Sequence, residues 1–272
     1  MHGPKSEYPI GLVPNLGYST PAPDHSGRVP ASYTGVDGCR GGWVAVTLAA
    51  DGSWRSGIYT RLQELWEDHE RSQLILIDMP IGLAEGSEGR LCDSLARNRL
   101  KPGRASSIFP APVREVLEAD EYAEANRLQR QLSGKGLSRQ TWGLVPKIRE
   151  LDGLMQRSGQ ARVIVRESHP ELCFAELFGG PMRHSKREEA GFAERMSHLG
   201  GIWPHAGQAV AELLERYPRR IAARDDIVDA IVLAVTAWLS EGLPEELPAK
   251  GDIDRMGLRR TISFVNAAGR EN

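Results

Sequence analysis

An apolar hairpin near the start of the chain restricts the possible folds more than any other stretch. Residues 32–49 read S-Y-T-G-V-D-G-C-R-G-G-W-V-A-V-T-L-A, so two β-rich runs flank five turn residues, Gly38 to Gly42. This pattern predicts an antiparallel hairpin. Asp37 comes at the end of the first strand, where its carboxylate either faces a ligand or shapes the turn by accepting bonds from backbone amides. Ordered structure is therefore expected to begin near Ser32 with a sheet.

The composition is that of an ordinary globular protein. Of the 272 residues, 40% are hydrophobic and 26% are charged, and the formal net charge of -2 gives no general attraction to nucleic acid. The three cysteines lie far apart without metal-type spacing, which favours reduced thiols. No apolar run has the length of a membrane span, and the first residues do not have the pattern of a signal peptide. We therefore expect a cytoplasmic protein without a membrane partner.

Proline and glycine content and hydrophobic pattern suggest how the chain is divided. Residues 1–31 are interrupted by many prolines and glycines and are expected to form a flexible arm. Residues 32–241 are expected to form one α/β domain, in which residues 85–159 make a mainly helical insertion over one end of the sheet. Residues 242–272 are expected to be a C-terminal extension with one edge strand over residues 257–265.

Local patterns predict the elements of the α/β domain. Short apolar runs predict strands over residues 54–60, 74–79 and 162–166. Apolar spacings of three and four residues predict helices over residues 61–71, 113–117, 122–132, 140–156, 186–199, 206–216 and 224–239. Ser168 and Glu171 have the spacing of a capping box, which predicts the start of a further helix.

Carboxylates stand where the predicted strands end and where the last predicted helix begins. Asp78 and Glu167 each close an apolar run. The last helix is apolar nearly all round after Asp229, and a carboxylate in such a buried helix needs a cation to compensate it. Asp226 shares a helix face with Asp229, although acidic residues in a first turn are also common caps.

Carboxylates in these positions are suited to hard divalent cations. Mg²⁺ is bound by a few carboxylates together with waters and substrate phosphates. Two such ions, about 3.5–4 Å apart, activate a water and stabilise the leaving oxygen in phosphodiester cleavage. The expected metal ligands and catalytic residues are Asp37, Asp78, Glu167, Asp226 and Asp229.

Several motifs resemble those of one family, and they occur between about Thr34 and Trp238. They are G-V-D-G-C-R-G-G-W-V-A-V, I-D-M-P-I-G-L, S-S-I-F-P-A-P-V-R, K-I-R-E-L-D, E-S-H-P-E-L-C-F and D-D-I-V-D-A-I-V-L-A. This set is similar to the motifs of the domain of unknown function family 429 (DUF429), predicted nucleases with a ribonuclease-H-like fold.

The resemblance implies a five-stranded mixed sheet flanked by helices, with three antiparallel strands followed by two parallel ones. It implies kinship with Holliday-junction resolvases and related enzymes, whose acidic clusters bind two Mg²⁺ or Mn²⁺ ions, so either ion is the expected cofactor. Mapped residue by residue, the metal positions of the family fall on Asp37, Asp78, Glu167 and Asp229, with Asp226 as the fifth.

Basic residues near these motifs are candidates for contact with substrate phosphates. Arg40 lies in the hairpin turn, three residues from Asp37, and His169 follows Glu167 by two residues. Each of these residues also has an alternative to phosphate binding. For a basic side chain the alternative is a solvated surface charge or part of an ion pair, and for the histidine it is a bond to the backbone. The expected substrate-binding residues are Arg40, Arg104, Lys147, His169, Lys186 and Arg195.

The leading hypothesis is a metal-dependent nuclease whose substrate and partner is DNA or RNA. A first alternative is an ATP-binding phosphotransferase of the actin and sugar-kinase type, because a glycine turn after an Asp-bearing strand also suits phosphate binding. That architecture needs two similar halves, and only one such hairpin is visible in the sequence. A second alternative is a non-catalytic module of the same fold that binds nucleic acid or a protein.

Overall fold

The computed structural model describes residues 30–266, and its main feature is one mixed sheet. The expected N-terminal arm lies, apart from Pro30 and Ala31, outside the described residues. The sheet has five strands in the order β3-β2-β1-β4-β5. The strands are β1 (Ser32–Cys39), β2 (Gly42–Ala49), β3 (Trp54–Tyr59), β4 (Leu74–Ile77) and β5 (Val165–Glu167).

The pairing of the strands confirms the expected ribonuclease-H-like fold. β1 runs antiparallel to β2, and β2 runs antiparallel to β3. On the other side, β1 pairs parallel with β4, and β4 pairs parallel with β5. Three antiparallel strands are therefore followed by two parallel ones, as the family resemblance implies.

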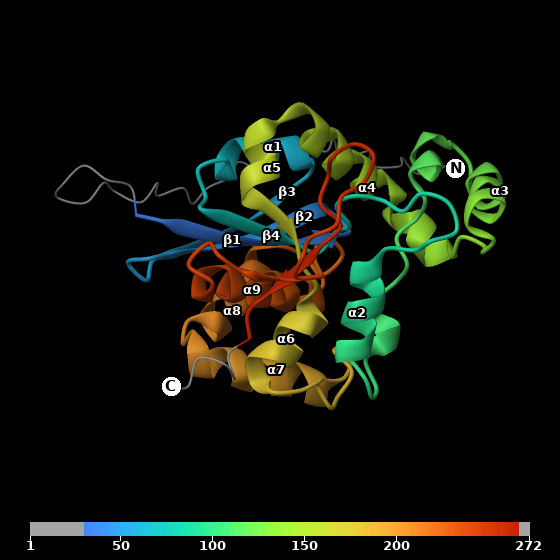
Figure 1. Ribbon diagram of the computed structural model, residues 1–272. Helices are drawn as coiled ribbons and strands as arrows, with labels where there is room; N and C mark the ends of the chain where they lie inside the picture. Colours follow the sequence, from blue (N-terminus) through green and yellow to red (C-terminus); the bar gives the residue numbers. More distant parts are fainter. Residues whose placement is uncertain (1–29, 267–272) are drawn as a thin grey trace, which may run out of the picture.

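Helices cover both faces of the sheet (Figure 1). α1, α4 and α5 lie over one face, and α6, α7, α8 and α9 lie over the other. α2 and α3 stand beside the sheet. The helices of the described chain are α1 (Leu62–His69), α2 (Leu91–Arg99), η1 (Ala105–Ser107), η2 (Arg114–Glu118), α3 (Tyr122–Ser133), α4 (Arg139–Arg157), α5 (Gly159–Ile164), α6 (Pro170–Phe178), α7 (Glu189–Ile202), α8 (Ala206–Arg216) and α9 (Arg224–Leu239).

Side chains alternate between the two faces along the central strands, as the period of a β-strand requires. In β4, Leu74 and Leu76 pack toward α9, whereas Ile75 and Ile77 pack toward α1 and α4. All four are almost completely buried. The continuous apolar run is therefore a strand buried on both faces, as predicted.

Helix α9 lies unusually close to β1, and Gly35 permits this approach. A Cβ atom at Gly35 would stand 2.1 Å from the backbone nitrogen of Ala234 and 2.2 Å from the carbonyl oxygen of Ala230. Any side chain at this position would push α9 away from the sheet. The close contact fixes the first turns of α9 relative to the end of β1.

The hairpin turn is shorter than predicted. β1 continues to Cys39 and β2 begins at Gly42, and the two residues pair with each other, so Arg40 and Gly41 alone form the turn. Gly42 has a φ of 129°, a conformation that favours glycine. Asp37 therefore lies within the paired part of β1, opposite Val44, and not beyond its last pair.

Two local predictions around β5 were wrong. Residues 159–164 form helix α5, so the strand predicted over 162–166 is reduced to the three residues of β5. Ser158 starts this helix because its side chain accepts a bond from the amide of Ala161. The capping box of Ser168 and Glu171 is also absent, since the N-cap of α6 is His169 and the Ser168 hydroxyl donates to the Ser263 carbonyl.

The insertion and the C-terminal extension are both joined closely to the domain. α4, which the sequence assigned to the insertion, buries Val145, Ile148 and Leu151 against the sheet. The extension forms a separate two-stranded sheet of β6 (Glu245–Leu247) and β7 (Ile262–Phe264). Its Asp254 is buried and accepts bonds from Arg114 and from the amide of Leu83.

Between residues 30 and 266, no helix combines the length and the apolar character that a membrane crossing requires.

Candidate functional site

A cleft of about 540 Å³ opens at the ends of β1, β4 and β5 and at the start of α9. Segment 104–109 and the first turns of α4 line one side of it, and segment 185–187 lines another. All of the predicted metal ligands contribute to its lining: Asp37, Asp78, Glu167, Asp226 and Asp229. Residues that are up to 192 positions apart in the sequence, Asp37 and Asp229, therefore line one cleft.

Strand alternation brings Asp37 and Asp78 to the same face of the sheet. Asp37 is four residues from Tyr33 and Asp78 is two residues from Leu76, so each lies on the same face of the sheet as that residue. Tyr33 and Leu76 both pack toward α9. The amide of Asp78 donates to the Val36 carbonyl, which holds the end of β4 beside β1. α9 then adds Asp229 from the second turn of a helix that is buried nearly all round.

Asp37 and Asp229 are buried carboxylates that repel each other. Only 7% of Asp37 and 1% of Asp229 is exposed. Burial raises the pKa of Asp37 well above its ordinary value, and the charges of Asp78 and Asp229 raise it further. Burial likewise raises the pKa of Asp229 to about 6. The Gly38 amide donates to Asp37 Oδ1 at 2.7 Å, so this carboxylate also shapes its own turn.

Lys186 is the cation that compensates this group. Its Nζ lies 2.5 Å from Asp229 Oδ2 and 3.9 Å from Asp225 Oδ2. The charge of Asp229, followed by that of Asp37, raises the pKa of Lys186. The prediction that Lys186 serves the cleft is therefore consistent with its position, but its nearest partner is a carboxylate of the protein.

Asp226 lies at the edge of the group and also caps α9. Its Oδ2 accepts a bond from the amide of Ala223 at 2.9 Å, which is the capping role considered for this residue. Burial raises its pKa, and Asp226 in turn raises the pKa of Asp37. Capping and proximity to the other carboxylates are thus combined in one side chain.

Glu167 lines the same cleft but belongs to a different polar group. It pairs with Ile77 in the sheet and so has the parity of the face opposite to Asp37 and Asp78. Its carboxylate accepts bonds from the Ile81 amide at 2.7 Å and from the buried Arg90, which also pairs with Asp93. Burial raises the pKa of Glu167 to about 7 despite the Arg90 charge.

The structure places some of the predicted substrate-binding residues at the cleft and others away from it. Arg104, His169 and Lys186 line the cleft, whereas Arg40 and Lys147 do not. Arg40 is exposed in the hairpin turn, and the Lys147 ammonium lies 5.3 Å from the centre of the Trp43 ring. His169 Nε2 is 3.3 Å from the Ser107 carbonyl, while its buried Nδ1 has no partner within the described residues.

Arg195 is not placed to contact a substrate. Only 1% of it is exposed, and its guanidinium donates to the carbonyls of His184 and Gly191 and to Glu171 Oε1 at 2.5 Å. Arg195 therefore forms an ion pair inside the protein, which is the alternative to phosphate binding that the sequence left open. Its partner Glu171 also lines the cleft, with Oε2 buried and unpartnered in the part of the chain that is described.

Several residues of the cleft lining were not predicted as site residues, among them Glu171, Asp93, Arg187 and Phe109. Glu171 was interpreted as part of a capping box, and Asp93 and Arg187 belong to no pattern that singles them out. Phe109 is not among the predicted site residues, although it is 40% exposed at the cleft. Its position within the motif S-S-I-F-P-A-P-V-R was the available signal.

The donor chemistry of the cleft fits a hard divalent cation. Its carboxylate oxygens are the ligands that Mg²⁺ and Mn²⁺ prefer. The backbone amide of Asp78 donates to the Val36 carbonyl, but its carboxylate has no hydrogen-bond or ion-pair partner among residues 30–266, so its oxygens are available. Within the same residues, no three His, Cys, Asp or Glu side chains are grouped tightly enough to form a ready ligand set. The negative charges of Asp78 and Asp229 raise the pKa of Asp37, and a cation among these three carboxylates would relieve that repulsion.

Comparison with known proteins gives one match. The model of a family described as "Protein of unknown function (DUF429)" matches residues 35–252. Searches of curated proteins and of solved structures give no match. Because the matched segment covers most of the 272 residues, the chain belongs to the DUF429 family.

Proposed function

We propose that this protein hydrolyses phosphodiester bonds of nucleic acid with divalent metal ions held by the cleft carboxylates. The observation that supports this proposal is the meeting of Asp37, Asp78 and Asp229 in one cleft, although they come from separate elements. Carboxylates outnumber basic side chains in the cleft lining. Without further cations, this excess of negative charge would repel a polyanionic substrate. Bound metal ions remove that repulsion.

The proposed ligands are Asp37, Asp78 and Asp229, with Asp226 beside them. Rigid elements position each of them: a paired strand, the end of a buried strand and a buried helix. Mg²⁺ or Mn²⁺, when bound, supplies an activated water and a counter-charge for the leaving oxygen. Glu167 contributes through the lone pairs that Arg90 and the Ile81 amide leave free.

The cleft also offers groups of the kind that bind a nucleic-acid strand. Arg104 and Arg187 line it and carry the positive charge that phosphates require. Phe109 presents an exposed ring on which a base would stack. In our proposal these residues hold the strand across the carboxylates, and His169 lines the same cleft beside them.

The phosphotransferase alternative receives less support. It requires two similar halves, each with its own phosphate-binding hairpin. Residues 30–266 contain one five-stranded sheet and one two-stranded sheet, so no second half of this kind occurs in the described chain. The cytoplasmic location expected from the sequence stays part of the proposal. The three cysteines are buried free thiols, which is compatible with a reducing compartment.

A nuclease assay with isosteric variants tests the proposal. Purified protein is incubated with single-stranded and duplex DNA and RNA in Mg²⁺ or Mn²⁺, with and without chelator. We expect cleavage that depends on metal, and we expect Asp37→Asn and Asp229→Asn to abolish it. The control is Asp120→Asn, which should cleave like the wild type because Asp120 is exposed and lies outside the cleft lining. Unchanged turnover in both cleft variants contradicts the proposed site. Absence of cleavage together with tight Mg²⁺-ATP binding in calorimetry favours the phosphotransferase.

A further inference from the structure

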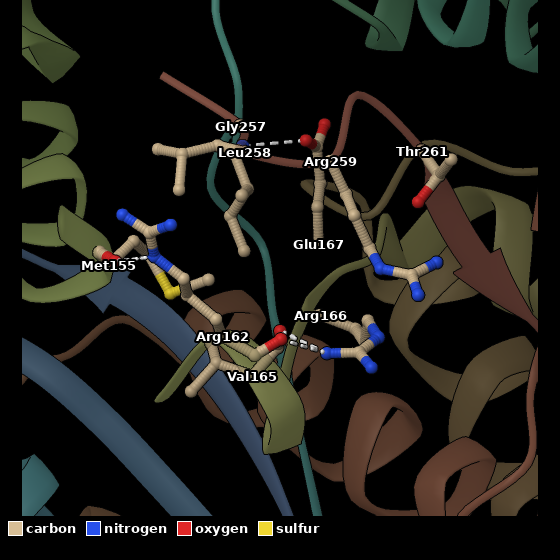
Figure 2. Close-up of a pocket in the computed structure, with 10 residues that line it drawn as sticks. Met155, Arg162, Val165, Arg166, Glu167, Gly257, Leu258, Arg259 and Thr261 are labelled. Atoms are coloured by element: carbon tan, nitrogen blue, oxygen red, sulfur yellow. Dashed lines mark hydrogen bonds between the residues drawn. The ribbon is translucent and has the colours of Figure 1, made fainter. Parts of the chain in front are cut away.

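A second, smaller pocket lies beside β5 and is bordered by three arginines (Figure 2). Its volume is about 70 Å³. Arg162 stands on the side of Met155, and Arg166 and Arg259 stand on the opposite side. Thr261 and the backbone around Gly257 complete the lining, and Glu167 lines both this pocket and the carboxylate cleft.

The three guanidiniums are anchored in ways that leave N–H groups free. Arg162 donates through Nε to the Met155 carbonyl at 2.6 Å, and Arg166 donates through Nη1 to the carbonyls of Arg162 and Val165. Arg259 donates through Nη1 to Glu246 at 3.1 Å. Within the described residues, Nη1 of Arg162 and Nη2 of both Arg166 and Arg259 have no acceptor. The anchored groups are therefore preorganised donors.

The positive charge of this pocket exceeds the negative charge that faces it. Glu246 is the carboxylate that Arg166 and Arg259 share, at 3.6 Å and 3.1 Å. The charge of Glu167 is already opposed by the buried Arg90. Burial and the neighbouring charge of Arg259 lower the pKa of Arg166 although Glu246 raises it, which agrees with a positive charge that is compensated only in part. An anion in the pocket would relieve this repulsion.

We propose that this arginine pocket, formed by Arg162, Arg166 and Arg259, binds a phosphate group. Guanidinium forks match the oxygens of phosphates and carboxylates equally well in geometry. A phosphate presents three or more oxygens and about two charges, which suits three guanidiniums that approach from two sides, whereas a carboxylate offers two oxygens and one charge. The proposal does not depend on hydrolysis in the neighbouring cleft.

Calorimetric titration of the full chain with inorganic phosphate, in the presence of a metal chelator, tests the pocket. We expect saturable binding, and we expect Arg259→Gln to weaken it about tenfold because a charge-assisted hydrogen bond is lost. Arg255→Gln is the matched control. The side chains of Arg255 and Arg259 are both 51% exposed and each pairs with one glutamate, but Arg255 does not line the pocket.

A variant with the opposite effect makes the test stringent. Glu246→Gln removes the carboxylate that competes for Arg166 and Arg259, so it is expected to tighten phosphate binding, while acetate binds weakly to every variant. Thermal melting of each variant verifies that it is folded. The proposal is overturned if wild-type protein binds no phosphate, or if Arg255→Gln weakens binding as much as Arg259→Gln.

The source of the phosphate group is distinguished in a separate comparison. Oligonucleotides with a 5′-phosphate and with a 5′-hydroxyl are bound in the presence of chelator. If the phosphorylated strand binds more tightly and Arg259→Gln removes this difference, the pocket binds the phosphate at a nucleic-acid end. Equal binding of both strands, with inorganic phosphate still bound, assigns it to free phosphate. A defect in cleavage alone leaves these binding results unchanged, so the two proposals fail separately.

Discussion

The Lys186 ammonium lies 2.5 Å from Asp229 Oδ2, where it occupies the position of a counter-ion for the buried carboxylates. The carboxylate is almost wholly buried, while 37% of the lysine side chain is exposed. A divalent cation can therefore displace Lys186 from Asp229, because the released ammonium can turn toward water and is not left buried without a partner. Lys186 therefore occupies the carboxylate group that is proposed to bind metal, and supplies a positive charge there.

Replacement of Lys186 tests this relationship. We expect Lys186→Met to lower the metal-free free energy of unfolding by about 1–2 kcal/mol, less than for a fully buried pair because water screens the exposed ammonium. Mg²⁺ should then stabilise the variant more than the wild type, since no tethered cation competes for Asp229. Melting temperatures with and without Mg²⁺ measure both effects, and the exposed Lys135→Met is the control. Equal Mg²⁺-induced shifts in variant and wild type contradict the idea.

The raised pKa of Asp229 predicts a pH dependence of stability. Its pKa rises from an ordinary value of 3.8 to about 6 in the folded protein, so folding favours the protonated carboxyl. The stability that this group contributes is complete below about pH 4 and is lost as the pH rises through about 6. We therefore expect metal-free wild type to lose stability relative to Asp229→Asn over this window. Denaturant unfolding of both proteins at a series of pH values measures the difference.

Added metal should reverse this trend, because the ligands must be deprotonated before they bind. Stabilisation by Mg²⁺ is expected to be small near pH 5 and larger near pH 8. A stability difference between wild type and Asp229→Asn that does not change with pH would show that the carboxyl is unperturbed.

The convergence of the carboxylates was predictable because it depends on local rules. A period of two along β1 and along the run that ends at Asp78 decides which face each carboxylate takes, and parallel pairing aligns the two strand ends. The apolar surroundings of Asp229 in the sequence already required a buried helix. These properties are carried by neighbouring residues, so the sequence alone was sufficient for Asp37, Asp78 and Asp229, but not for Glu167, which bonds to Arg90.

Two of the failures share a physical cause, which is a partner distant in the sequence, whereas the third depends on a local helix cap. Ser168 was predicted to cap a helix, but its hydroxyl bonds to the carbonyl of Ser263 in the C-terminal extension. The strand predicted around Val163 forms a helix in which that valine is 66% exposed, so the cap at Ser158 outweighs β-propensity. Arg195 and Glu171 are 24 residues apart, and no local pattern indicates that they pair.

Arg195 provides a prediction that separates a structural role from substrate binding. Removal of its guanidinium leaves the buried Glu171 unpaired, so Arg195→Gln should lower the free energy of unfolding by about 3–5 kcal/mol. The double variant Arg195→Gln with Glu171→Gln is expected to regain part of this loss, because no buried charge is then left alone. Denaturant unfolding measures both. A variant that keeps its stability but loses nucleic-acid affinity would restore the phosphate-binding role predicted from the sequence.

Phe109 provides a prediction about the form of the substrate. Phe109 is 40% exposed at the cleft, in the segment that also carries Arg104. A base must leave a duplex to stack on such a ring, and stacking contributes about 1–3 kcal/mol per base. We therefore expect Phe109→Ala, in an Asp37→Asn background that prevents cleavage, to weaken binding of single-stranded oligonucleotides about tenfold or more. Duplex binding should change little.

The matched control for this prediction is Leu132→Ala. Leu132 is an apolar residue of similar exposure, 37%, on α3, and it does not line the cleft. Fluorescence anisotropy with labelled strands compares the variants, and Phe109→Trp should restore affinity because it retains an aromatic face. If Leu132→Ala weakens binding as much as Phe109→Ala, the effect belongs to exposed apolar surface in general. If single strands and duplexes weaken equally, the ring supports the fold of the cleft wall and does not bind a base.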